Sequence, residues 1–198
     1  MKKIVLFGGA FNPPHLGHLI IIQQAFELIP KIAQLWVLPC YQHTFQKELV
    51  SAKHRLHLAQ LLIEQLPPIL INKVRLETIE HDYQLSGETY EALQLLKKQY
   101  SQHQFVFLMG SDQLKSFKKW GNWQKLLKAI PFYVYPRSGY QNHINFPNMQ
   151  LLKSETQVIT NLSSTLIRKR VGEKLPLTNL APKTIINYLK KHQLYTLR

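Results

Sequence analysis

The sequence has little cysteine, since Cys40 is the only one among 198 residues. A single thiol excludes an intrachain disulfide framework and is typical of proteins from a reducing compartment. Long apolar runs are also lacking. The apolar run after Lys2 and Lys3 ends at Gly8, which makes it too short for a signal peptide, and later runs are interrupted by Gln, Glu or Pro. We therefore expect a cytoplasmic protein with no membrane-spanning segment.

Acidic residues are scarce, because 11 Asp and Glu stand against 25 Lys and Arg, a net charge of +14 with neutral histidines. This excess attracts polyanions such as nucleotides, nucleic acids or acidic lipids, without discriminating among them. Hydrophobic residues make up 45% of the chain, enough for a full core, so disordered and fibrous classes are excluded. The length fits one domain over residues 1–198, with a helical carboxyl-terminal part from about residue 161 to 198.

Apolar runs bounded by Gly or Pro alternate with segments of helical periodicity. We expect strands over residues 3–7, 34–38, 69–74, 105–109 and 132–135. We expect helices over 16–29, 51–66, 86–100, 164–171 and 182–192, short helical turns over 113–127, and a linker over 138–147. This alternation predicts an α/β protein with a Rossmann-like, doubly wound, mostly parallel sheet and helices on both faces. Such sheets bind ligands beyond the carboxyl ends of their strands, which points to the loops after Phe7 and Met109.

The first of these loops reads Gly-Gly-Ala-Phe-Asn-Pro-Pro-His-Leu-Gly-His over residues 8–18. Gly8 and Gly9 allow the backbone to turn sharply and to approach a ligand closely. Asn12 precedes a proline, which disfavours helical geometry and suits a helix N-cap. The helix that follows directs free N–H groups and a positive dipole end toward the loop. These features predict an anion site.

Two histidines add donors to this loop. His15 and His18 are three residues apart, so both side chains lie on one face of the first helical turn, and Gly17 between them leaves room for a ligand or a neighbouring strand. The pattern indicates a phosphate site with two imidazole donors. The alternative, a strand–turn–helix junction with incidental histidines, does not account for all these residue types in register.

A second candidate phosphate site reads Ser-Ser-Thr-Leu-Ile-Arg over residues 163–168. Paired serines before an apolar-periodic run indicate a helix amino terminus. Arg168 lies four residues after Ser164, and helical side chains lean toward the amino terminus, so its guanidinium is expected near the capping region. Hydroxyls, free N–H groups and a forked cation suit a phosphate. Taken alone, the segment is more typical of an ordinary capped surface helix.

The loop after Met109 contributes Gly110 and Asp112 at the carboxyl edge of the expected sheet. Asp112 is a candidate acceptor for a ribose hydroxyl. Its alternative role is to cap the next helical turn.

These segments resemble known motifs. Residues 8–18 resemble the G-x-F-x-P-x-H-x-G-H signature of the nucleotidyltransferase superfamily, with matches at Gly9, Phe11, Pro13, His15, Gly17 and His18. In that family the histidines hold the triphosphate while the incoming phosphate attacks the α-phosphorus directly. Ala10 and Asn12 depart from the more frequent Thr or Ser and Asp. Residues 163–168 resemble the Ser-Ser-Thr-x-Ile-Arg motif with which pyridine-nucleotide adenylyltransferases grip the ATP phosphates.

The resemblance extends to the expected pyridine pocket. Residues 110–120 are similar to a Gly-x-Asp-x-Leu…Trp segment, which implies that Trp120 stacks on the pyridine ring, with Trp123 as the alternative. Residues 86–89 stand where that family has Ser-Tyr-Thr, so Thr89 is expected at the substrate. Glu88 departs from the usual Tyr, and a carboxylate pointing inward would favour an amide over an acid. Residues 39–55 depart further from the nicotinate enzymes, and Lys47 is the candidate contact to the substrate phosphate.

The resemblance implies an enzyme that transfers the adenylyl group of ATP to nicotinate or nicotinamide mononucleotide, releases pyrophosphate and serves NAD biosynthesis. Mg²⁺ is expected on the ATP phosphates, without metal ligands from the protein. The implied catalytic residues are His15, His18 and Arg168. The implied ATP contacts are Gly8, Gly9, Ala10, Phe11, His15, Gly17, His18, Gly110, Asp112, Ser163, Ser164, Thr165 and Arg168. The implied substrate contacts are Asn12, Lys47, Thr89 and Trp120. A homo-oligomer is left open.

Two alternatives remain. Another member of the superfamily would transfer a nucleotidyl group to phosphopantetheine or to a polyol phosphate, although residues 163–168 and Trp120 argue against it. A nucleic-acid-binding module would use the lysines that interleave with two tryptophans as a stacking platform. These residues are Lys115, Lys118, Lys119, Lys125, Trp120 and Trp123. That alternative leaves His15, Gly17 and His18 unexplained.

Overall fold

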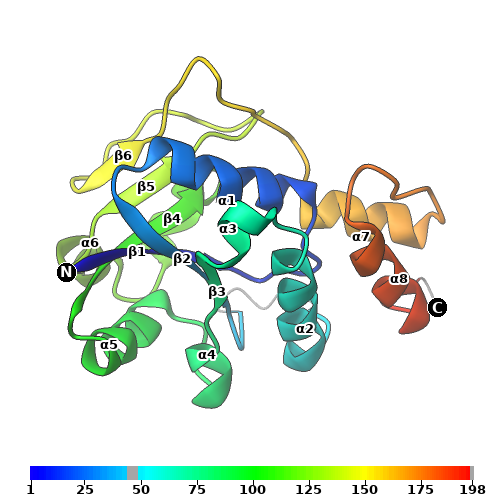
Figure 1. Cartoon of the computed structure of the whole chain (residues 1–198), viewed down its shortest axis with the longest axis horizontal. Coiled ribbons are helices and arrows are strands. Elements are labelled where there is room, and N and C mark those ends of the chain that lie inside the picture. Colours follow the sequence, from blue (N-terminus) through cyan, green and yellow to red (C-terminus); the bar gives the residue numbers. More distant parts are fainter. Residues whose placement is uncertain (44–48, 197–198) are drawn as a thin grey trace.

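A six-stranded, all-parallel sheet forms the centre of the protein in the computed structural model, which describes residues 1–43 and 49–196 (Figure 1). The strand order is β3-β2-β1-β4-β5-β6. The strands are β1 Lys2–Gly9, β2 Ile32–Pro39, β3 Val74–Leu76, β4 His103–Gly110, β5 Phe132–Tyr135 and β6 Met149–Leu151. The order reverses direction between β1 and β4, which is the switch point of a doubly wound sheet. The predicted Rossmann-like fold is confirmed.

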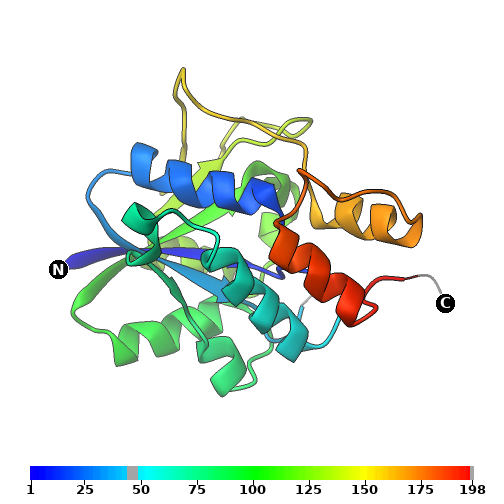
Figure 2. The same cartoon turned by 45° about the vertical axis from the view of Figure 1, so that its right-hand side comes forward.

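Helices cover both faces of the sheet (Figures 1 and 2). One face packs against α1 Leu16–Leu28, α2 Ala52–Ile63, α3 Pro68–Ile71, α7 Ser164–Gly172 and α8 Lys183–Lys191. The other face packs against α4 Ile79–Asp82, α5 Thr89–Gln99, the 3₁₀ helix η1 Ser111–Lys119 and α6 Trp123–Ala129. Each set of helices buries its apolar side chains in a separate core cluster. The sheet is therefore the middle layer of three.

Strand β1 contributes to both cores. Val5 and Phe7 belong to the core under α1, whereas Ile4 and Leu6 belong to the core under α5. All four side chains are buried, as the continuous apolar run predicts for a central strand of a parallel sheet. Burial on both faces holds the carboxyl end of β1, and therefore the loop that follows it, in a fixed position.

The carboxyl-terminal helices lie near the beginning of α1. Ile185 and Leu189 of α8 are buried in the same core as α1 and α2, and α8 packs directly against α2. The N–H of Leu16 donates to the carbonyl of Leu180 at 3.0 Å. This arrangement places α7 and α8 at the carboxyl edge of the sheet, where the loop after β1 also ends (Figure 2).

The strand expected over residues 69–74 is wrong. The chain forms the short helix α3 there, and β3 begins only at Val74. Pro68 occupies the first turn of α3, where its missing N–H costs no hydrogen bond, and Ile69 is 74% exposed, unlike a residue in a buried strand. The helix expected from residue 86 begins at Thr89. The short elements α4 and β6 were not predicted, because runs of three or four residues carry too little periodicity.

Candidate active site

A cavity of about 810 Å³ opens beside the carboxyl ends of β1 and β4. It is lined by most of the residues predicted to bind ATP or the second substrate, which are Gly8, Gly9, Ala10, Phe11, Asn12, His15, His18, Thr89, Gly110, Asp112, Trp120, Ser163, Ser164, Thr165 and Arg168. These residues come from segments that lie far apart in the sequence and meet at the switch point. Lys47 lies outside the described residues. Gly17 is buried beneath the cavity wall and plays a packing role described below.

The loop after β1 turns at a different residue than expected. Gly8 and Gly9 are the last residues of β1, and the left-handed backbone conformation belongs to Phe11, with φ of 48°. Gly8 is needed for another reason, because a Cβ at this position would lie 2.6 Å from Cζ of Phe107 on the neighbouring strand β4. The glycine therefore allows β1 and the aromatic ring of β4 to pack closely.

Asn12 is not the helix cap that the sequence suggested. Helix α1 begins at Leu16 with His15 in the N-cap position, and the prolines precede the helix. The Asn12 side chain is 2% exposed, and its Oδ1 accepts hydrogen bonds from the Val50 N–H at 3.3 Å and from the Tyr195 hydroxyl at 2.6 Å. Asn12 thus connects the loop to two distant segments.

His15 and His18 lie together at the base of the cavity, with ring centroids 4.0 Å apart. The N–H of His15 donates to Nδ1 of His18 at 3.2 Å. An acceptor at Nδ1 requires the neutral ring to carry its proton on Nε2. A Cβ at Gly17 would lie 2.9 Å from Nδ1 of His15, so the glycine makes room for this ring.

Both histidines are held in the neutral form. Burial, followed by the positive charge of Arg137, lowers the pKa of His18 to about 3. Burial, followed by His18 and Arg137, lowers the pKa of His15 well below its usual value. Neutral rings act as hydrogen-bond donors at neutral pH rather than as cations. The positive charge of the cavity therefore comes from its arginines and lysines.

Helix α7 brings a second group of donors to the first loop. Ser163 is its N-cap and accepts a hydrogen bond from the Leu166 N–H at 3.1 Å. The Ser164 hydroxyl donates to the carbonyl of Pro13 at 2.8 Å. Arg168 donates from Nη1 to the carbonyl of Asn12 at 2.8 Å. The expected capped amino terminus and the Arg168 fork therefore face the same cavity as the histidines.

Arg137 lines the cavity and was not predicted from the sequence. It follows β5, and its Nη1 lies 3.5 Å from Oδ2 of Asp112. It also donates to the carbonyl of Leu162, immediately before the α7 cap. Asp112 lies in the first turn of η1 but does not cap it, because the N-cap residue is Gly110. The position of Arg137 at the carboxyl end of a parallel strand was the available signal.

Trp120 lines the same cavity as the histidines and Arg168. Its ring packs against Phe107 and Phe117, with centroids 6.0 Å and 5.3 Å away. The carboxylate of Glu88 also lines the cavity and covers Gly121, the residue after Trp120, since a Cβ on that glycine would lie 2.2 Å from Cδ of Glu88. The lining beside Gly121 therefore combines an aromatic ring with an acidic group.

Trp123, the alternative to Trp120, packs instead against Phe117 and Phe146. The lysines proposed for nucleic-acid binding have different surroundings. Lys115 and Lys119 line the cavity with Trp120. Lys125 lies over the ring of Tyr90, with its Nζ 6.0 Å from the centroid. The two tryptophans do not form a shared stacking platform.

Arg55 is fully buried and holds the walls of the cavity. The residue is 1% exposed. Its guanidinium donates to the carbonyls of Val50 and Ala10, each at 3.2 Å. It also donates to the carbonyls of Cys40 and Tyr41. These acceptors belong to the loops after β1 and β2 and to the segment before α2. One side chain therefore satisfies the buried backbone of three segments.

We predict that Arg55→Met destabilises the fold by about 3 kcal/mol, because four partly buried carbonyls lose their donor. For a chain of this length that corresponds to a melting temperature lower by roughly 6–12 °C. Lys53→Met, on the exposed side of the same helix, is the matched control and is expected to melt like the parent. Equal melting temperatures for the two variants would contradict this role of Arg55.

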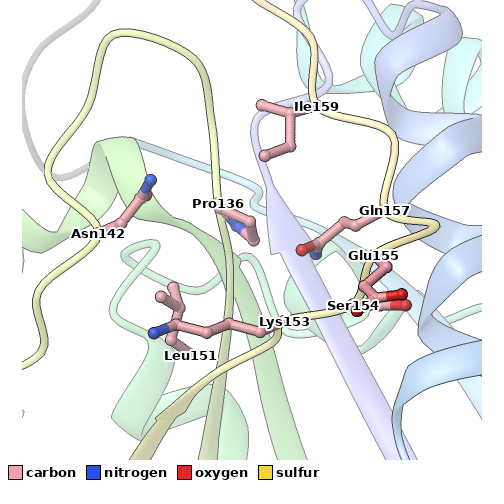
Figure 3. Close-up of a pocket in the computed structure, with 8 residues that line it drawn as sticks. All are labelled: Pro136, Asn142, Leu151, Lys153, Ser154, Glu155, Gln157 and Ile159. Carbon is pink, nitrogen blue, oxygen red and sulfur yellow. The ribbon is translucent and has the colours of Figure 1, made fainter.

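A second, more open cavity of about 490 Å³ lies over the strands at the β6 edge of the sheet (Figure 3). Its lining residues come from the segments around β5 and β6 and are Pro136, Asn142, Leu151, Lys153, Ser154, Glu155, Gln157 and Ile159. All of them lie outside the predicted site. No group of three or more His, Cys, Asp or Glu side chains suited to a metal ion is found within residues 1–43 and 49–196. None of the helices in the same two ranges is long and apolar enough to cross a membrane.

Comparison with known proteins places this site in a family. The cytidylyltransferase-like family matches residues 6–170. The chain is 33% identical over 198 residues to a probable nicotinate-nucleotide adenylyltransferase of Bacillus pumilus, covering 98% of this chain and 99% of that protein. It is 31% identical over 202 residues to a protein of the same name from Carboxydothermus hydrogenoformans, covering 98% of each chain.

Solved structures share the fold. The nicotinic acid mononucleotide adenylyltransferase of Plasmodium falciparum complexed with NaAD superposes with a TM-score of 0.84 at 23% identity, covering 98% of each chain. The same protein complexed with APC gives a TM-score of 0.81 over the same coverage. The sequence matches show that the chain belongs to the cytidylyltransferase-like family and, within it, to the nicotinate-nucleotide adenylyltransferases, which serve NAD biosynthesis.

Proposed function

We propose that this chain transfers the adenylyl group of ATP to a pyridine mononucleotide, forming the dinucleotide and pyrophosphate. The observation that carries the proposal is the convergence of the two predicted phosphate motifs on one cavity that Trp120 also lines. The names of the relatives supply the acceptor, a nicotinate nucleotide, and the group transferred, an adenylyl group. With these substrates the enzyme would act in the cytoplasm.

The triphosphate occupies the end of the cavity that holds His15, His18 and Arg168 in this proposal. The neutral histidines donate hydrogen bonds to its oxygens, and the amino terminus of α7 with Arg168 supplies N–H groups and positive charge. The phosphate of the mononucleotide then attacks the α-phosphorus in line, the bond to the bridging oxygen breaks, and pyrophosphate leaves. No side chain forms a covalent bond, so the rate comes from positioning and charge stabilisation.

Magnesium fits this site as an ion carried by the nucleotide. Among residues 1–43 and 49–196, three acidic side chains line the cavity, and each has a different partner: Glu80 accepts a hydrogen bond from the Tyr41 N–H, Glu88 covers Gly121 and Asp112 pairs with Arg137. Hard cations of this kind are held through one or two carboxylates and substrate phosphates. An ion bound to the triphosphate would neutralise part of its negative charge. His15, His18 and Arg168 would then bind phosphate oxygens that the ion does not.

The pyridine ring of the second substrate could carry either a carboxylate or an amide. The relatives' names favour the acid, nicotinate mononucleotide. The Glu88 carboxylate at the Trp120 end of the cavity favours the amide, because it repels a second carboxylate and accepts hydrogen bonds from an amide. We retain both candidates in the test of the function.

The test is pyrophosphate release by the purified protein with ATP and Mg²⁺ and each acceptor in turn. The acceptors are nicotinate mononucleotide, nicotinamide mononucleotide and phosphopantetheine, with CTP and a polyol phosphate as a further pair. We expect release with at least one mononucleotide, and the ratio of kcat/KM identifies the preferred one. Release only with phosphopantetheine, or only with CTP and a polyol phosphate, would be consistent with a nucleotidyltransferase. It would contradict the assignment of a pyridine mononucleotide as the acceptor.

We predict that Trp120→Ala raises the KM of the mononucleotide about tenfold or more while the KM of ATP changes little. Loss of the ring removes roughly 1–3 kcal/mol of stacking on the base, and Trp120 belongs to neither of the two predicted phosphate motifs. Trp123→Ala is the control for a lost tryptophan, since that ring packs against Phe117 and Phe146. A tenfold increase in the KM of ATP instead would indicate that Trp120 contacts ATP rather than the mononucleotide.

A further inference from the structure

The carboxyl-terminal segment reaches the candidate active site through Tyr195. Its hydroxyl donates to Oδ1 of Asn12 at 2.6 Å, across 183 residues of sequence. Tyr195 follows α8 and lies outside the two predicted phosphate motifs. This contact joins the end of the chain to the loop that carries His15 and His18.

Asn12 transmits this contact to the cavity. Its side chain also accepts a hydrogen bond from the Val50 N–H at 3.3 Å, and its main-chain carbonyl accepts one from Nη1 of Arg168 at 2.8 Å. The side chain and the carbonyl belong to one residue that is 2% exposed and precedes two prolines. A displacement of Asn12 therefore also displaces the acceptor that orients Arg168.

The backbone conformation of Tyr195 indicates that the surrounding structure determines its hydrogen bond to Asn12. Its φ is 63°, in the left-handed region that tyrosine rarely adopts. Such a conformation is unfavourable for a residue with a side chain and persists only where the surrounding structure determines it. Burial raises the pKa of the Tyr195 hydroxyl, so it keeps its proton and remains a donor to Asn12 at neutral pH.

We propose that Tyr195 is a positioning residue for adenylyl transfer, which fixes Asn12 and through it the Arg168 guanidinium at the phosphate end of the cavity. The inference rests on the proposed function, in which Arg168 binds the triphosphate. The carboxyl-terminal segment is then part of the active-site framework, although Tyr195 does not itself line the cavity.

Tyr188→Phe provides a matched control for Tyr195→Phe. Tyr188 lies on α8, and its hydroxyl is 2.9 Å from Nδ1 of His54, away from the cavity. Both variants lose one hydroxyl hydrogen bond and keep the aromatic ring. We therefore expect similar, small decreases in melting temperature for the two variants, so that a general loss of stability does not separate them.

The experiment measures kcat and the KM of ATP for the parent, Tyr195→Phe and Tyr188→Phe, with ATP, Mg²⁺ and whichever mononucleotide the parent accepts. We expect kcat of Tyr195→Phe to fall about tenfold with little change in KM, because a less well oriented Arg168 loses an interaction made in the transition state. Tyr188→Phe is expected to keep the parent kcat. Equal kcat values for all three, or an equal decrease in both variants, would overturn the proposal.

A double-mutant cycle tests whether Tyr195 acts through Arg168. In an Arg168→Ala background, adding Tyr195→Phe is expected to leave kcat unchanged, because the group that it orients is gone. A further tenfold decrease in that background would overturn the proposed route. Failure of the parent to turn over either mononucleotide would contradict the proposed function itself, and with it the inference, whereas an active parent isolates the role of Tyr195.

Discussion

His18→Ala is expected to lower kcat by about a hundred- to thousandfold. Removal of one preorganised donor to a developing charge typically costs roughly 3–4 kcal/mol in activation free energy. The Nε2–H of His18 is such a donor, because the His15 N–H occupies Nδ1 and burial, followed by Arg137, lowers the pKa of the ring to about 3. The measurement is steady-state pyrophosphate release at saturating ATP.

Two further variants separate this role from packing. His18→Gln places an amide N–H near the position of Nε2 and is expected to recover part of the activity. His143→Ala removes an exposed histidine outside the cavity and is expected to retain the parent kcat. If His18→Ala turns over near the parent rate while remaining folded, the histidine pair does not hold the phosphates and the assignment fails.

Arg168→Ala is expected to lower kcat/KM for ATP by a similar factor. The guanidinium is held by the Asn12 carbonyl at 2.8 Å and by the Thr165 hydroxyl at 3.2 Å, which fixes its plane at the cavity. Arg168→Lys keeps the charge but has a single nitrogen in place of the planar fork. We therefore expect Arg168→Lys to recover only part of the lost activity.

Arg170→Ala is the matched control on the same helix. Its guanidinium binds the carbonyl of Pro176 at 2.8 Å and 3.0 Å, away from the cavity. We expect near-parent kinetics from this variant. Equal losses in Arg168→Ala and Arg170→Ala would indicate damage to α7 rather than loss of a phosphate contact.

The two candidate phosphate-binding segments could be recognised from the sequence because each is defined by local spacing. His15 and His18 share one helical turn, and Ser163, Ser164 and Arg168 share the start of another, so residue type and separation alone define each group. The strand–helix alternation then predicts that both segments reach the carboxyl edge of the sheet. The structure brings both groups to one cavity.

The residues that the sequence did not reveal act through long-range contacts. Arg55 binds carbonyls up to 45 residues away, and Arg137 and Tyr195 also meet their partners only after folding. Neither a single arginine nor a tyrosine near the carboxyl terminus belongs to a spacing pattern that predicts these contacts. Asn12 was misinterpreted for the same reason, since its partners Val50 and Tyr195 come from other segments.

The stereochemical course at the α-phosphorus of ATP tests the central claim, direct adenylyl transfer to the mononucleotide, most directly. ATP made chiral at this phosphorus is converted with the accepted mononucleotide, and the configuration of the dinucleotide is determined by phosphorus NMR. A single in-line displacement predicts inverted configuration in the product. Retained configuration would indicate two displacements through an enzyme-bound adenylate and would contradict a site that works by positioning and charge stabilisation alone.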